Sequence, residues 1–102
     1  MALSITEPVG TQVNCSVPVE LDQNGNNFPI VPANMVWATD DEAVSGPLTT
    51  NADGSASFTG VAAGTANITV TDSKYTLTSP PGAATFTPVV VPAPVSISFT
   101  FA

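Results

Sequence analysis

Apolar and polar residues alternate along several short stretches of this chain, and this alternation constrains the fold more than any other feature. In "VSISFTF" (residues 95–101) every second side chain is apolar, and "ANITVT" (66–71) and "VNCSVPVEL" (13–21) follow the same rule. Successive side chains of a β-strand point to opposite faces, so each stretch predicts a half-buried strand. Pro18 indicates a sheet edge or a bulge in the 13–21 stretch. Shorter strands are expected at 3–6, 35–39, 48–50 and 55–59.

Turn signals separate these stretches. Asn24-Gly25 and Asp53-Gly54 are pairs that favour a positive φ angle. About seven short strands separated by such turns predict an all-β sandwich, and a chain of 102 residues is long enough for one two-layer core. We therefore expect a single domain over residues 1–102.

The segment 73–94 differs from the rest because five prolines interrupt it. Proline cannot donate a backbone hydrogen bond, so the segment is not expected to be a central strand throughout. It could form a protruding hairpin with Pro81-Gly82 at its tip, or an extended arm that ends in "VVVPAP". The last strand is then expected at 95–101, packed into the core, and deletion of residues 95–102 is expected to unfold the domain or make it aggregate.

The charge balance excludes several classes of partner. The net charge is −7, with one lysine, no arginine and no histidine, so the chain lacks the cations that bind nucleic acid or an anionic membrane. No apolar run approaches the roughly 20 residues that cross a bilayer. "MALSITEPVG" has no basic segment followed by an apolar one, so no secretory signal is expected. If residues 1–102 are the full reading frame, the protein is expected to be made and folded in the cytoplasm.

Catalytic chemistry is not expected. Without histidine, neither a Ser-His-Asp nor a Cys-His arrangement can be built, and zinc lacks its usual ligands. Cys15, the single cysteine, is expected to pack as a small apolar residue. No cofactor is expected.

The acidic run Asp40, Asp41 and Glu42 directly follows the strand that carries Trp37. A solvated loop is the simpler interpretation, because two carboxylates exposed to water lack the contrasting environments that acid–base catalysis needs. Calcium binding is the weaker alternative, since the DxDxDG spacing of a calcium loop is absent.

"MVWATDDEAV" followed by "NADGSASFTGVAAGTANITVTDS" resembles the bacterial immunoglobulin-like domains of group 2, which occur in bacterial adhesins and in phage virion proteins. The Trp-bearing strand, the acidic turn, the "ADG" hairpin and "GTANITV" match that family in order and spacing, over about residues 11–72. The resemblance implies an immunoglobulin-like sandwich with Trp37 between the two sheets. The long segment 73–94 departs from the family pattern.

Two functions are expected from this resemblance and from the polar, nearly uncharged composition. The first is a phage structural protein on the capsid surface, a decoration (cement) protein or a head-fibre module, that binds the major capsid protein or another virion protein and could form a homo-oligomer. The alternative is a binding or spacer module of an adhesin at the bacterial cell surface. In the first case the expected contact residues are Tyr75, Leu77, Phe86, Val89, Val90 and Val91.

Overall fold

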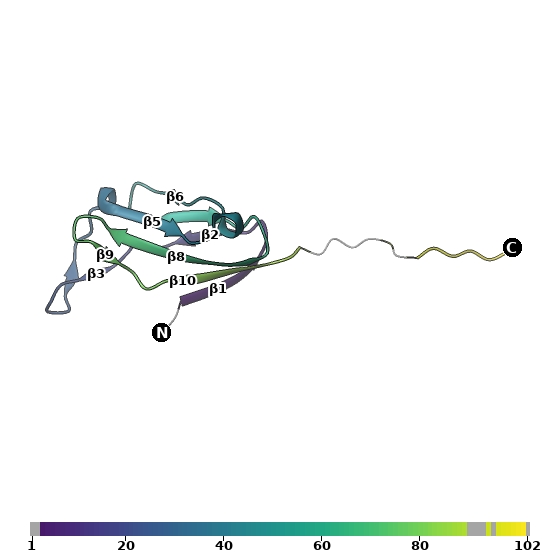
Figure 1. The fold of residues 1–102 in the computed structure, drawn as a ribbon, viewed down its shortest axis with the longest axis horizontal. Coiled ribbons are helices and arrows are strands. Elements are labelled where there is room, and N and C mark those ends of the chain that lie inside the picture. The colour runs from purple at the N-terminus through teal and green to yellow at the C-terminus, as the bar shows by residue number, and fades with distance from the viewer. Residues whose placement is uncertain (1–2, 90–93, 95, 102) are drawn as a thin grey trace.

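The computed structural model describes residues 3–89, 94 and 96–101, and these residues form a mostly β protein with several sheets. Figure 1 shows the strands gathered into one body, with the C-terminal end far from it. The bounds of the strands are β1 Leu3–Pro8, β2 Gln12–Cys15, β3 Glu20–Leu21, β4 Asn27–Phe28, β5 Met35–Thr39, β6 Thr49–Thr50, β7 Ala56–Thr59, β8 Gly64–Asp72, β9 Leu77–Thr78 and β10 Gly82–Thr87. One four-residue helix, α1 (Glu42–Ser45), and one 3-10 turn (Pro32–Asn34) complete the described elements.

The larger sheet has the order β1-β10-β8-β5, and β9 also pairs with β8. Its β10–β8 and β8–β5 pairs are antiparallel, whereas β1 runs parallel to β10, with Ile5 opposite Ala84. A second sheet has the order β2-β7-β6, and β3 and β4 form a separate hairpin. This confirms the prediction that the fold is mostly β.

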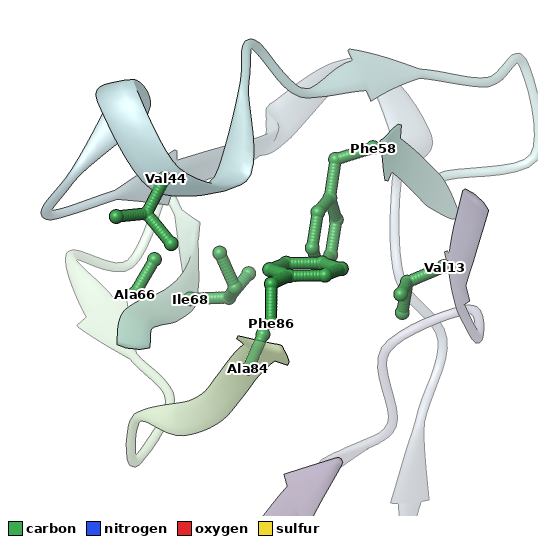
Figure 2. Packing of buried hydrophobic residues seen from close by; sticks show 7 residues of the cluster. All are labelled: Val13, Val44, Phe58, Ala66, Ile68, Ala84 and Phe86. Atoms are coloured by element: carbon green, nitrogen blue, oxygen red, sulfur yellow. The ribbon is translucent and has the colours of Figure 1, made fainter. Parts of the chain in front are cut away.

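The two larger sheets contribute side chains to one hydrophobic core. Phe58 of β7 and Phe86 of β10 meet edge to face, with ring centroids 6.1 Å apart (Figure 2). Such a pair adds about 0.5–1.5 kcal/mol to the stability gained from burial of the rings. Ala66 and Ala84 are also buried in this core, and Ala66 lies beside Val44 of α1 (Figure 2). The whole cluster is Val13, Val44, Phe58, Ala66, Ile68, Ala84 and Phe86.

Trp37 packs against this cluster but is only partly buried. Its indole Nε1 donates a hydrogen bond to the carbonyl oxygen of Gly54 at 2.9 Å, which links β5 to the turn before β7. Gly54 has a φ of +92°, as the Asp53-Gly54 signal predicts. Cys15 also packs against the core, and burial raises the pKa of its thiol. The expectation of an apolar role for Cys15 is therefore consistent with its place in the fold.

Among the described residues the last strand is β10, and residues 96–101 form no strand, which corrects the sequence-based assignment. Residues 96–101 have no strand pairing, and the Ile97 side chain is 99% exposed. Val95 lies outside the described residues. β10 fits between β1 and β8 because Gly82 and Ala84 are small where β1 approaches, while Phe86 fills the core.

Prolines delimit β10 instead of disrupting it. Pro80 and Pro81 precede the strand and Pro88 follows it, so each proline lies where no ladder hydrogen bond is required. The segment 73–94 was expected to protrude as a hairpin or an arm, but β9 and β10 both belong to the larger sheet. Because residues 96–101 are no part of the core cluster, their removal is not expected to unfold the domain, contrary to the expectation from sequence.

Candidate functional site

The hairpin of β3 and β4 lies at the end of the molecule away from the C-terminal segment (Figure 1). β2 ends at Cys15, before Pro18, so the alternation in 13–21 does not continue as one paired strand. Asp22 then fixes the turn, because its carboxylate accepts the backbone N–H groups of Asn24 at 2.8 Å and Asn26 at 3.0 Å. Gly25 completes the turn with a φ of +79°, as the Asn-Gly signal predicts.

Between this hairpin and β9 the surface is hollowed. Two adjoining depressions of about 200 Å³ and 290 Å³ share Glu20, Leu21 and Leu77 in their walls. We call this surface the β3–β9 hollow and define it by its exposed apolar rim: Val19, Leu21, Phe28, Tyr75 and Leu77. Large apolar side chains exposed together in this way are typical of a binding surface.

An aromatic pair forms one wall of the hollow. Phe28 and Tyr75 contact edge to face, with centroids 5.5 Å apart and rings at 90°. The ammonium group of Lys74, the single cationic side chain of the protein, lies 5.4 Å from the centre of the Tyr75 ring. The ring pair and the cation together hold Tyr75 in place at the rim.

Two carboxyl groups meet in the hollow. Asp72, at the end of β8, is 5% exposed and accepts the backbone N–H of Lys74 at 3.0 Å. Among the described residues, Oε2 of Glu20 is the buried side-chain oxygen without a hydrogen-bond partner. The pKa of Glu20 is raised, mainly by burial of the carboxyl group and in second place by the neighbouring Asp72 carboxyl group. Two ionised carboxylates cannot hydrogen-bond to each other, but a protonated Glu20 can donate to Asp72.

The Glu20–Asp72 contact makes stability dependent on pH. Because the pKa of Glu20 is raised in the folded state above its ordinary value of 4.5, the folded chain binds more protons than the unfolded chain between those two values. The contribution of this contact is therefore present at low pH and is lost as the pH rises through the folded pKa. We expect Glu20→Gln to raise the melting temperature at pH 7 by a small amount, because the uncharged amide removes the repulsion from Asp72 and solvent screening keeps that repulsion weak.

Glu42→Gln is the matched control, since it removes the same charge from an exposed side chain on α1. Thermal melts of both variants and of the wild type at pH 4 and pH 7 test the effect. The melting temperature of Glu20→Gln is expected to exceed that of the wild type at pH 7, and to exceed it by much less at pH 4. If both variants raise the melting temperature equally at pH 7, the effect comes from the lower net charge and not from the Glu20–Asp72 contact.

The contact residues expected from sequence fall in three different places. Tyr75 and Leu77 lie on the rim of the hollow, 48% and 57% exposed, and Val89 is exposed just beyond β10. Phe86 is 2% exposed in the core, so its assignment as a contact residue was wrong: the alternation of β10 turns this ring inward. Val90 and Val91 lie outside the described residues.

The acidic run does not assemble into a site with other acidic residues. Both carboxylate oxygens of Asp40 are occupied by Asn67, through its backbone N–H at 2.7 Å and its amide Nδ2 at 2.8 Å. These two hydrogen bonds lower the pKa of Asp40, and the bond from the backbone N–H of Asn67 has the larger effect. Asp41 is the N-cap residue of α1, and Glu42 is its first residue. Within the part of the chain that the structure describes, no three potential metal-ligating side chains come together.

Sequence reasoning missed the residues that give the hollow its shape. Val19 and Leu21 were expected to face a core, but they are 75% and 61% exposed because β2 ends before them. Pro18 was the available signal for this change. No signal could pair Glu20 with Asp72, since their contact depends on how β3 lies against β8.

The C-terminal segment is a second candidate surface. In residues 96–101 the apolar side chains Ile97, Phe99 and Phe101 are 99%, 82% and 94% exposed. The rings of Phe99 and Phe101 contact each other with centroids 5.7 Å apart. The segment accounts for the elongated shape of the molecule, which measures 82 Å along its longest axis (Figure 1).

Comparison of the chain with family models, with curated proteins and with solved structures finds no match. Over residues 3–89, 94 and 96–101, the helices are too short to cross a bilayer.

Proposed function

We propose that this protein is a non-catalytic structural component of a phage virion, a capsid decoration (cement) protein or a head-fibre module with an immunoglobulin-like fold. The observation that carries the proposal is the exposed C-terminal segment with Ile97, Phe99 and Phe101. Three large apolar side chains held in water cost free energy that burial against a partner recovers, at about 1.5–3 kcal/mol for each side chain. Such a segment serves adhesion.

The strand arrangement supports the immunoglobulin-like part of this proposal. Immunoglobulin-like sandwiches pack two sheets face to face, and one of the two contains the strand that bears the core tryptophan. In this chain the sheet of order β2-β7-β6 shares the core with the sheet that contains β5. In this chain Trp37 lies on β5 and packs against the core. The order of the strands along the chain and the sequence resemblance over about residues 11–72 favour the same family.

The proposed mechanism is attachment through strand edges and the C-terminal segment. β1 is the outer strand of its sheet, and its Leu3 and Ile5 side chains are 75% and 39% exposed. A strand edge with exposed apolar side chains can accept a strand from a neighbouring protein. Contacts of this kind between adjacent capsid subunits would raise the barrier to their separation.

Localisation of the protein tests this function. Particles from the source of the gene, purified by density gradient and analysed by mass spectrometry, are expected to contain the chain in a fixed ratio to the major capsid protein. A Phe99→Ser, Phe101→Ser double variant, expressed in place of the wild type, is expected to be lost from the particles while the particles still form. Absence of the wild-type chain from purified particles would overturn the proposal.

A second candidate function is favoured by the aromatic wall of the β3–β9 hollow. Sugar-binding surfaces combine exposed aromatic rings with polar side chains, and here Tyr75 and Phe28 stand beside Asp22 and Gln23. This arrangement would suit an adhesin module at the bacterial surface that binds a glycan. Binding to a glycan array that is abolished by Tyr75→Ser, but kept by the Phe99→Ser, Phe101→Ser variant, would favour this function over attachment to a capsid.

A further inference from the structure

The described part of the C-terminal segment has the side-chain pattern of a β-strand but lacks a strand partner. Ile97, Phe99 and Phe101 alternate with serine and threonine, as the two faces of an amphipathic strand require. In the described residues 96–101 no strand pairing occurs, and these three side chains are almost fully exposed. The segment is therefore suited to complete a sheet that is not its own.

The β3–β9 hollow offers a matching receptor. Its rim holds five exposed apolar residues, Val19, Leu21, Phe28, Tyr75 and Leu77. The strands beside it are short: β3 pairs with β4 and β9 pairs with β8, each over two residues. Short strands of this kind leave backbone groups beside the hollow for an incoming strand, and the hollow can take apolar side chains of that strand.

The distribution of charge allows two copies to meet in this way. All eight acidic residues lie between Glu7 and Asp72, and no charged side chain follows Lys74. Two copies with a net charge of −7 each repel one another. The segment carries no charged side chain, so it can nevertheless enter the hollow beside Glu20 and Asp22 without placing a charged side chain against these carboxylates.

The two surfaces lie at opposite ends of the molecule. Figure 1 shows the C-terminal end extending away from the body on the side opposite β3 and β9. Fully extended, residues 88–101 span at most about 46–50 Å, so the apolar residues can reach well beyond the body that carries them. A segment directed away from its own hollow is placed to meet the hollow of another copy.

We propose that residues 96–101 of one copy dock as a β-strand into the β3–β9 hollow of a second copy, so that the molecules join head to tail. The contact is heterologous, because the inserted segment and the hollow are different surfaces. Repetition of a heterologous contact gives open chains or closed rings. This inference goes beyond the proposed function, since self-association can be measured in the purified protein without any particle.

Sedimentation velocity of the wild type over a range of concentrations is the first test. We expect a concentration-dependent series of species that extends beyond the dimer. Two variants should sediment as monomers: Phe99→Ser with Phe101→Ser in the inserted segment, and Leu77→Asp in the hollow. Val61→Asp is the matched control for Leu77→Asp, because Val61 is also exposed, at 55%, but lies outside the hollow, so this variant should associate like the wild type.

Mixing the two monomeric variants tests the polarity of the contact. The Leu77→Asp copy keeps an intact segment, and the double-serine copy keeps an intact hollow. An equal mixture is expected to form a one-to-one heterodimer and nothing larger, because each pair contains one working contact. A heterodimer also demonstrates that both variants are folded.

Three results would overturn the proposal. A wild type that stays monomeric at the highest soluble concentration would show that the segment does not dock into the hollow of a second copy. Association that persists in the double-serine variant would place the contact elsewhere. Variants that are monomeric alone, melt like the wild type and still fail to combine would exclude a contact between the segment and the hollow.

Discussion

Replacement of Phe86 by alanine is expected to lower the free energy of unfolding by about 3–5 kcal/mol, the usual cost of removing a buried phenylalanine side chain. Phe86 is 2% exposed and meets Phe58 edge to face, so the variant loses the burial of the ring, loses the aromatic contact and gains a cavity (Figure 2). A domain of this size has a total stability of about 5–15 kcal/mol. The variant should therefore lose a large part of the stability of the domain.

Phe99→Ala is the matched control, since it makes the same chemical change at a side chain that is 82% exposed. Urea denaturation of both variants, in dilute solution so that self-association does not contribute, measures the two costs. Phe99→Ala is expected to change the stability by less than about 0.5 kcal/mol, as for an ordinary surface substitution. Equal losses in the two variants would mean that the C-terminal segment packs in the core after all.

This comparison also shows what side-chain alternation can and cannot predict. The pattern correctly gave β5 at Met35–Thr39 and the inward side chains of β8, Ala66 and Ile68. It also predicted a buried strand at 95–101, where Ile97 is exposed to solvent. Alternation predicts that a segment can cover an apolar surface. It does not predict whether that surface belongs to the same molecule.

The strand that completes the sheet was obscured by its flanking prolines. Gly82–Thr87 has the same alternation, but Ala84 is a weak apolar signal beside the large residues of the C-terminal segment. Its place is decided by fit between β1 and β8, where Gly82 lies against the side chain of Leu3. Fit of this kind depends on strands distant in the sequence, so composition and spacing could not show it.

The candidate site was predictable only in part for the same reason. Tyr75 and Leu77 were expected as contact residues and lie on the rim of the hollow. Their neighbour Phe28 comes from the β3–β4 hairpin, nearly fifty residues earlier in the chain. The position of that hairpin follows from the end of β2 before Pro18, and an interruption by proline does not by itself predict where the chain goes next.

Gly60 is expected to be the least replaceable glycine of the core. A Cβ atom at this position would lie 2.2 Å from Cδ1 and 2.4 Å from Cε1 of Phe86, far closer than two carbon atoms can approach. The backbone of Gly60 is held in place because its carbonyl oxygen accepts the N–H of Gly10 at 2.9 Å. We expect Gly60→Ala to cost about 3 kcal/mol, the upper part of the usual range for an overfilled core.

A double-mutant cycle with Phe86→Ala tests the physical origin of this cost. Once the ring is removed, a methyl group at position 60 occupies part of the space that it leaves, so Gly60→Ala should cost much less in the Phe86→Ala background, with a coupling of about 1–3 kcal/mol. Gly82→Ala is the control, because its Cβ would meet only the exposed side chain of Leu3, at 3.3 Å, which can move away. That variant should be nearly neutral. Additive costs for Gly60→Ala and Phe86→Ala would contradict the packing of the ring over Gly60, and with it the arrangement of β10 against β7 on which the core depends.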